Sequence, residues 1–189
     1  MRLVYRIIKE NRIILLAGLS MWVFVLAATF LSILLQGPPE QGNNLPPVHL
    51  PWSQIFMHNA GLAILYIILG NLTFGSLAFL LMLYNIYIVS YAIYYTYMHT
   101  GSIGFSIAII FTHGILEIAA MLLCFLLSTT SLRWAMNKIY KKTIFSINSV
   151  ETKAGLVVCM MLLYLVASVI ESYLSPIVPA KFLGLEIVQ

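Results

Sequence analysis

The longest apolar stretch of this chain, Ile55–Met98, contains no lysine, arginine, aspartate or glutamate. A helix needs about 20 apolar residues to cross a bilayer, so this stretch is long enough for two crossings and has to turn back on itself. The turn is best placed in LGNLTFGS, where Gly70 and Gly75 bracket a short segment. We therefore predict spans at 55–69 and 76–98. The first of these is short, which indicates local thinning of the bilayer, tilt or a sheltered position.

Three further apolar stretches predict spans at 13–35, 103–127 and 154–175. The composition agrees, because 61% of the residues are hydrophobic and 8% are charged, against about 25% charged residues in a soluble domain. The stretch at 13–35 is too long for a signal peptide, and no A-x-A-like site precedes Gly37, so we interpret it as an uncleaved span. The predicted fold class is all-α, a polytopic membrane bundle of about five helices.

The positions of the basic residues predict the orientation of the bundle. Nine of the ten lysines and arginines lie before the first span or between the fourth and fifth spans. With five spans these two segments share one side, which the positive-inside rule makes cytoplasmic. We predict a cytoplasmic segment at 1–12, a single transmembrane domain at 13–179 and an external tail at 180–189. The net charge of +4 is small and clustered, and does not indicate a nucleic-acid partner.

Two basic segments, MRLVYRIIKENR and SLRWAMNKIYKK, are amphipathic. The second contains Arg133, Trp134 and Tyr140 together with three lysines. We predict that both are interfacial segments held by anionic lipid headgroups. Docking onto a cytoplasmic partner is the alternative.

Two patterns inside the apolar stretches predict packing rather than chemistry. Cys124 and Cys159 are expected to be free thiols packed as small hydrophobic side chains. A series of tyrosines recurs at helical spacing in the third span, and we expect it in span cores and in the interfacial belts. The series consists of Tyr84, Tyr87, Tyr91, Tyr94 and Tyr95.

Polar side chains are rare within the predicted spans, and they lie at similar depths. His113 and Glu117 are one helical turn apart on one face of the fourth span, within roughly 3 Å of its centre. Glu171 lies roughly 10 Å further toward the outside on the fifth span. Two asparagines lie at neighbouring depths on the second and third spans. The predicted intramembrane polar cluster consists of Asn59, Asn85, His113, Glu117 and Glu171.

The sequence leaves three interpretations of this cluster open. The first is structural, with His113 and Glu117 hydrogen-bonded and the asparagines holding helices together. The second is a proton or ion path through the same two residues. The third is a metal site, for which the candidate ligands are His58, His113, Glu117 and Glu171. The motif H-E-x-x-H is absent, as are G-x-x-x-x-G-K-[ST], G-x-S-x-G and C-x-x-C. We therefore predict no catalytic residue, no cofactor and no resident metal.

Several short motifs together resemble the stage II sporulation protein M family. They are IFMHN, LGNLTFG, Asn85, HGILEIAA and VASVIESYLSPIVP, and they cover roughly residues 55–179. The resemblance marks Gly70, Gly75, Gly114 and Pro176 as structural residues. The chain differs from the family pattern at Ile86, where the family commonly has glycine. The matching positions are Asn59, Gly70, Gly75, Asn85, His113, Gly114, Glu117, Glu171 and Pro176.

The resemblance implies a function without an enzymatic activity. Founding members of the family take part in engulfment during sporulation, where they look like membrane scaffolds for peptidoglycan-degrading partners. Others occur beside export or bacteriocin genes. We therefore expect a multi-pass protein of the prokaryotic plasma membrane, a scaffold or subunit of a cell-envelope or export assembly. Its expected partners are the lipid bilayer and other membrane proteins, or further copies of itself. The alternatives are an oligomeric channel or transporter with an intramembrane His/Glu path, and an intramembrane metal-dependent hydrolase.

Overall fold

The structure is a computed structural model that describes residues 2–36, 50–147 and 149–174. Within these residues the regular structure is entirely helical, and five helices are long and apolar enough to cross a membrane. The predicted all-α membrane bundle is therefore confirmed, while the side of the membrane on which each terminus lies stays a prediction. The helices are α1 (Arg2–Gln36), α2 (Trp52–Leu72), α3 (Ser76–Thr100), α4 (Ile103–Ser128), α5 (Thr130–Ile139) and α6 (Val150–Tyr173).

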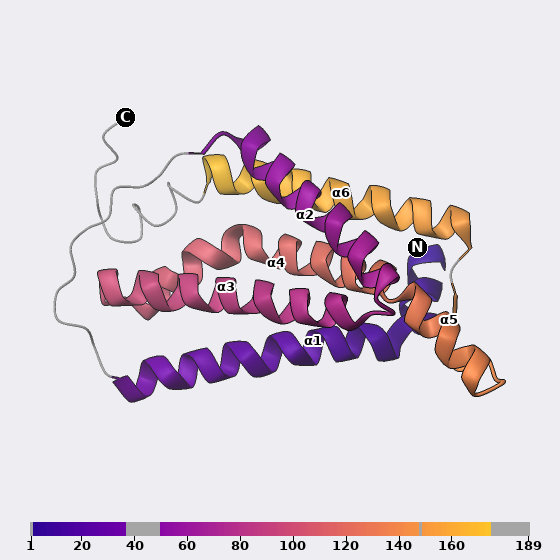
Figure 1. Cartoon of the computed structure of the whole chain (residues 1–189). Coiled ribbons are helices and arrows are strands. Elements are labelled where there is room, and N and C mark those ends of the chain that lie inside the picture. The colour runs from indigo at the N-terminus through magenta and orange to yellow at the C-terminus, as the bar shows by residue number, and fades with distance from the viewer. Residues whose placement is uncertain (1, 37–49, 148, 175–189) are drawn as a thin grey trace.

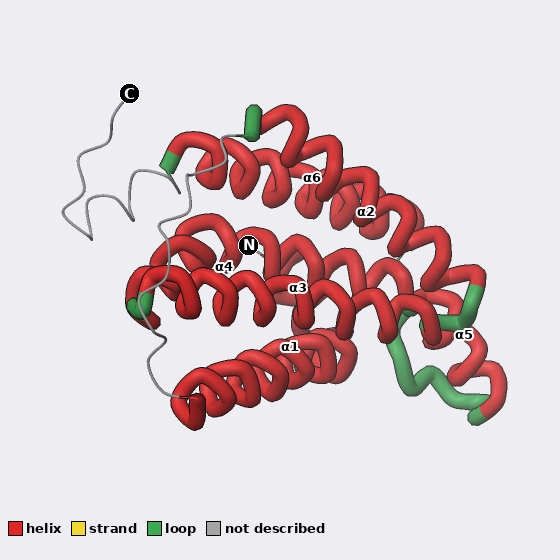
Figure 2. The backbone as a smooth tube through the Cα atoms, turned by 60° about the vertical axis from the view of Figure 1, so that its left-hand side comes forward, coloured by secondary structure: helices red, strands yellow, loops and turns green. Residues whose placement is uncertain are grey.

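Helix α4 is the centre of the bundle and contacts each of the other five helices. Figure 1 shows α2 and α6 on one side of α4 and α1 on the opposite side, and the rotated view of Figure 2 shows the same order. Helix α1 presents much of its surface outward, since Phe24 is 75% and Leu34 72% exposed. Such exposure is ordinary in a membrane, where lipid tails solvate apolar side chains.

Two helices differ from the predicted segments. Helix α1 is continuous from Arg2, so no break in the helix separates the predicted cytoplasmic residues up to 12 from the first span. Helix α2 has 21 residues and ends at Leu72, so it is a full-length span that needs no thinned bilayer. The prediction ended this helix too early because glycine usually interrupts helices, whereas Gly70 lies inside α2 and is buried.

The turn between α2 and α3 is held by hydrogen bonds across the hairpin. Gly75 has φ +86°, a left-handed conformation that glycine adopts without strain. The Tyr66 hydroxyl donates to the carbonyl of Ala78 at 2.6 Å. Asn71 connects the end of α2 to the next junction, because its side-chain amide donates to the Leu127 carbonyl at 3.0 Å. The tight hairpin thereby places α2 and α3 side by side against α4.

The main core lies between α2, α3, α4 and α6 and extends to Trp22 of α1. Ile86, at the position where the family commonly has glycine, is fully buried in it. A branched side chain therefore fills this position in the core. The buried members of this core are Trp22, Ala63, Tyr66, Ala78, Met82, Ile86, Ala120, Cys124, Phe125, Leu126, Leu127, Leu156, Met160 and Tyr164.

One end of the bundle, which we call the basic end, is formed by the starts of α1 and α6 and by α5. Arg133 of α5 was predicted to face lipid headgroups, but it is 1% exposed and packs inside this end. Its guanidinium donates to Asn11 Oδ1 at 2.6 Å and to the carbonyl oxygens of Ser146 and Leu126, both at 2.7 Å. Burial lowers the pKa of Arg133 to about 10, so the side chain is still a cation at neutral pH. Arg133 therefore joins α1, α4 and α5 instead of binding lipid.

The outward face of α5 fits the predicted interfacial position. Trp134 is 52% exposed, and Lys138 Nζ lies 5.0 Å from the centroid of its ring. An aromatic ring beside a cation is typical of residues at the headgroup level. Binding of this face to anionic lipid stays a prediction.

Two packing predictions for the spans require correction. Cys124 is buried as expected, but Cys159 is exposed on α6. Four tyrosines of α3 do not lie in the core: Tyr84, Tyr87, Tyr91 and Tyr95 are 40–60% exposed. The reason is that α3 turns its alanine, methionine and isoleucine positions toward α4, which leaves the tyrosine positions on the outer face.

Candidate functional site in the membrane

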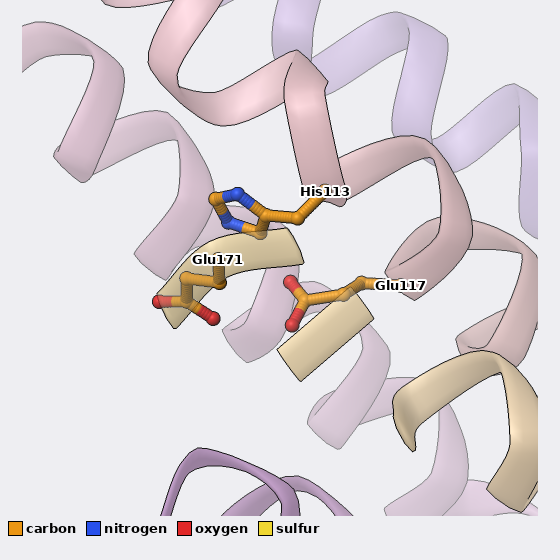
Figure 3. A group of neighbouring side chains, drawn as sticks. All are labelled: His113, Glu117 and Glu171. Carbon is orange, nitrogen blue, oxygen red and sulfur yellow. The ribbon is translucent and has the colours of Figure 1, made fainter. Parts of the chain in front are cut away.

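The polar residues of α4 and α6 form a compact cluster. His113, Glu117 and Glu171 each offer one nitrogen or oxygen atom, and these three atoms all lie within 4.8 Å of one another. None of the three side chains is exposed. Figure 3 shows the carboxyl groups of the two glutamates turned toward each other, with the imidazole of His113 beside them. We call this group the His-Glu-Glu cluster.

The offset between helices brings Glu171 level with the other two residues. The sequence predicted a depth difference of roughly 10 Å, which is not observed. Glu171 lies near the end of α6 at Tyr173, whereas His113 lies ten residues inside α4. Figure 1 shows that α3 and α4 reach further than α2 and α6 at the end opposite the basic end. The prediction assumed that the spans are centred at one depth, whereas α3 and α4 extend beyond α2 and α6 at this end.

Asn59 extends the cluster to α2. Its side-chain amide donates to Glu117 Oε1 at 2.8 Å. Asn85 of α3 lines the same cavity as Asn59 and Glu117, but its amide donates to the Leu81 carbonyl of its own helix at 2.8 Å. Asn59 is therefore bonded to the cluster, whereas Asn85 only borders it.

The remaining predicted residues are more peripheral. His58 is exposed and borders the cavity beside Asn59, but it is outside the group of ligand atoms that lie within 4.8 Å. Gly114 is buried next to His113 and lines the larger cavity. Pro176 lies outside the described residues.

Glu117 borders two cavities. The larger, of about 230 Å³, lies between α1, α3 and α4 and is also lined by His113 and Glu171. The smaller, of about 170 Å³, lies between α2, α3, α4 and α6 and contains Asn59, Asn85 and Tyr164 in its wall. Both are large enough for water molecules. The Glu117 carboxyl group thus stands between two spaces that small polar species can enter.

Trp22 is a polar residue of this site that the sequence analysis missed. It is 2% exposed and lines the larger cavity, and its indole Nε1 has no hydrogen-bond partner among the described residues. Buried polar groups normally have a partner. The available signal was its position in the middle of an apolar span, because tryptophan usually lies at the membrane surface.

The two carboxyl groups of the cluster need either a nearby positive charge or bound protons. Two ionised carboxyl groups this close repel one another, and the apolar surroundings strengthen the repulsion. The lysine and arginine side chains that the structure describes all belong to the basic end, far from Glu171. The cluster can therefore hold shared protons or bind a cation, and both chemistries use the same three residues.

The sequence comparisons identify a family for the chain. The family model described as stage II sporulation protein M matches residues 12–176. The chain belongs to the stage II sporulation protein M family. Neither a curated protein nor a solved structure matches it. For this family member the match extends the predicted resemblance back to Arg12, so that it includes nearly all of the first span in addition to the polar cluster.

We predict that the two asparagines differ in their contribution to stability. Asn59→Leu should lower the free energy of unfolding by about 1–2 kcal/mol, because it removes a hydrogen bond between helices and leaves Glu117 without that donor. Asn85→Leu should cost less than about 0.5 kcal/mol, because its amide only bonds a carbonyl already used within α3. Thermal unfolding of both variants in one detergent measures the difference. Equal losses would show that the bond from Asn59 to Glu117 contributes nothing.

Proposed function

We propose that this member of the stage II sporulation protein M family is a non-enzymatic subunit or scaffold of a cell-envelope or export assembly in a prokaryotic plasma membrane. We further propose that it binds a transmembrane helix of a partner protein along the outer face of α3. The observation that carries the proposal is the row of four exposed tyrosines on that face. We call it the tyrosine face, and it consists of Tyr84, Tyr87, Tyr91 and Tyr95.

The tyrosine face lies at a depth where lipid is a poor partner for it. Helix α3 runs from Ser76 to Thr100, so Tyr87 and Tyr91 lie within roughly 5 Å of its middle. Tyrosine is normally concentrated at the membrane surface, where its hydroxyl meets water. Within the described residues the hydroxyls of Tyr87 and Tyr91 make no hydrogen bond. A partner helix with polar groups at this depth would supply the missing bonds.

The rings on this face are already ordered. Tyr87 and Tyr91 stack with centroids 6.3 Å apart, and Tyr91 and Tyr95 stack at 6.0 Å. Ordered aromatic side chains lose little conformational entropy on binding and provide a large contact area. Aromatic residues of this kind dominate the binding energy of many interfaces. The stack therefore supports a surface prepared for a protein partner.

Little of the described chain lies outside the helix bundle, and this favours a binding role over catalysis. Among the described residues, only α5 and its connection to α6 extend from the bundle at the basic end (Figure 1). The surfaces that the described residues offer to a partner are therefore the membrane helices and this small surface. The exposed Trp134 and Lys138 of α5 give a second contact surface.

A transport path receives less support from the geometry. The cavities beside Glu117 lie on the side of the core away from the basic end. Between them and that end, Met82, Leu126 and Leu127 are almost completely buried. A single chain in this conformation therefore keeps a closed apolar layer where an ion path would have to continue.

The proposal is tested by site-specific crosslinking in the membrane. A photoreactive phenylalanine at position 87 or 91 should crosslink one defined membrane protein, which mass spectrometry identifies. The same group at Phe24, an aromatic position on α1 that is even more exposed, should not. The double substitution Tyr87→Ala and Tyr91→Ala should reduce recovery of that partner at least about tenfold without lowering thermal stability.

Three results would contradict this function. The first is that positions 87 and 91 yield only crosslinks to lipid. The second is a crosslink to a second copy of the chain alone, which would replace the partner helix with a homo-oligomer. The third is equal recovery of the partner with the wild-type and the double-substituted protein.

A further inference from the structure

We infer that His113, Glu117 and Glu171 bind one divalent transition-metal cation, for which Zn²⁺ is the best match. The site joins the middle of α4 to the end of α6. This inference is independent of the tyrosine face and goes beyond the proposed scaffold function. It rests on the donor atoms, their spacing, their charge and the cavity beside them.

The donor set is one that Zn²⁺ uses. One imidazole nitrogen and two carboxylate oxygens are common zinc ligands, at about 2.0–2.2 Å from the metal. Such ligands lie about 3.3 Å apart around a tetrahedral ion. The three atoms of the cluster already lie within 4.8 Å of one another, so small side-chain rotations close the remaining gap. The mixture of nitrogen and oxygen donors favours Zn²⁺, Mn²⁺ or Fe²⁺ over Mg²⁺ and Ca²⁺, which prefer oxygen alone.

A second layer of contacts orients the ligands. Asn59 donates to Glu117 Oε1 at 2.8 Å, which restrains the carboxyl group and leaves its other oxygen available. Metal-binding carboxylates and histidines usually have such outer partners, which fix their orientation. At the end of α6, the Ser172 hydroxyl donates to the Leu50 carbonyl at 3.1 Å, next to Glu171. Glu117 is therefore held by a contact from α2, and the residue that follows Glu171 is bonded to the segment that precedes α2.

The charge of the site matches a divalent cation. Two carboxylates and a neutral imidazole carry a charge of −2, which one M²⁺ ion neutralises. A neutral assembly is the least costly way to keep two carboxylates in a region of low dielectric constant. The described basic side chains are at the other end of the bundle and cannot provide this charge. A bound ion accounts for both glutamates at once, whereas a shared proton neutralises only one.

The larger cavity provides the fourth coordination position. Three protein ligands leave one tetrahedral position open, and a water molecule normally fills it. His113, Glu117 and Glu171 all line the cavity of about 230 Å³. Trp22 lines it as well, and its buried indole N–H is without a partner among the described residues. A metal-bound water is an acceptor for that N–H and would pair a donor that the described residues leave without a partner.

The test uses the full-length protein purified in detergent with an affinity tag that contains no histidine. After removal of metal with a chelator, Zn²⁺ is titrated against a chromophoric competitor. We expect one Zn²⁺ per chain. Saturation at about 100 times Kd should raise Tm by about 5 °C or more. Co²⁺ should give the visible absorption of a four-coordinate ion.

Conservative variants separate a metal site from a structural proton pair. Glu117→Gln and Glu171→Gln should each weaken Zn²⁺ binding about 100-fold or more, because each removes an anionic ligand. Without metal, both variants should be at least as thermostable as the wild type, since the substitution removes carboxylate repulsion. Trp22→Phe should keep the stoichiometry and weaken binding about tenfold. The exposed His58→Gln and Glu151→Gln variants are matched controls and should bind as the wild type does.

Three outcomes would overturn the inference. One is a folded wild-type protein that binds less than half an equivalent of Zn²⁺. Another is unchanged affinity in both glutamine variants. The last is an equal loss of affinity in His58→Gln, which would place the ion at the surface. If a glutamine variant does not fold, Trp22→Phe and Asn59→Ala take its place, and unchanged affinity in both of them also counts against the site.

Discussion

Replacing Arg133 with alanine is expected to lower the free energy of unfolding by about 4 kcal/mol. The guanidinium makes hydrogen bonds at 2.6–2.7 Å to Asn11, Ser146 and Leu126, which belong to three different segments of the chain. Hydrogen bonds from a charged donor contribute about 1.5–3 kcal/mol each, although neighbouring bonds are not additive. The substitution also removes the one donor group that these acceptors share at the junction of α1, α4 and α5.

Arg133→Lys distinguishes the charge of this residue from its shape. Lysine retains the positive charge but cannot reproduce the planar, forked donor geometry that reaches Asn11 and Leu126 together. We expect it to recover about half of the lost stability. Lys138→Ala, an exposed basic position of the same helix, should change stability by about 0.5 kcal/mol or less. Denaturant unfolding in micelles measures all three variants. A loss below about 1 kcal/mol for Arg133→Ala would show that this contact is incidental.

Gly70→Ala is expected to destabilise the bundle by about 3 kcal/mol. A Cβ atom at this position would lie 2.6 Å from Ser128 Cβ, 2.9 Å from the Ser128 carbonyl oxygen and 2.9 Å from Ala78 Cβ. Two of these contacts are to small side chains without freedom to rotate away, and the third is to the backbone. Helices α2 and α4 would have to separate, and forced separation of a packed interface typically costs about 1–3 kcal/mol.

The control for this prediction is a glycine in an open position. A Cβ atom at Gly61 of α2, or at Gly155 of α6, meets nothing within 4 Å. Alanine at either position should stabilise the protein by up to about 1 kcal/mol, because it favours helix more than glycine does. The predicted effects therefore have opposite signs for the same chemical change. Equal effects at positions 70 and 61 would show that close packing of α2 on α4 does not limit stability.

The large losses of stability expected for Arg133→Ala and Gly70→Ala both concern packing near the basic end. Gly70 packs against Ser128 where α2 meets the end of α4, and Arg133 follows five residues after Ser128, on α5. Asn71 bonds both to the Leu127 carbonyl and to the backbone N–H of Ser131, so it connects the two features. The His-Glu-Glu cluster lies beyond this region along α4. Substitutions in the cluster therefore should change ion binding without disrupting the junction.

Much of the site could be predicted because membrane depth is a strong constraint. A charged or amide side chain inside an apolar span is costly, so His113, Glu117 and Glu171 were identifiable as residues that need partners. Which of them meet depends on helix rotation and axial offset. Periodicity does not report these quantities when nearly every position of a helix is apolar. The same reason explains why Asn85 borders the cluster without bonding to it.

Three features could not be predicted from composition and spacing. Arg133 follows the pattern of an interfacial basic residue, and only the fold of the segment around Ser146 encloses it. Trp22 looks like one more apolar residue until the cavity beside it is seen. The tyrosines of α3 have the spacing of a core stripe, but their face points away from α4. In each case a local pattern is compatible with two environments, and packing against distant segments selects one.

The sequence by itself determined that the chain is a helical membrane protein, where its spans lie and which polar residues they contain. The physical reason is that hydrocarbon excludes unpaired polar groups, so an apolar run of sufficient length has few alternatives to a helix. Only the tertiary structure decided that α4 is central, that Glu171 is level with His113 and Glu117, and that Arg133 is buried. These outcomes depend on how far neighbouring helices slide and rotate against each other. That is set by close contacts such as Gly70 against Ser128, which become visible only when the helices are packed together.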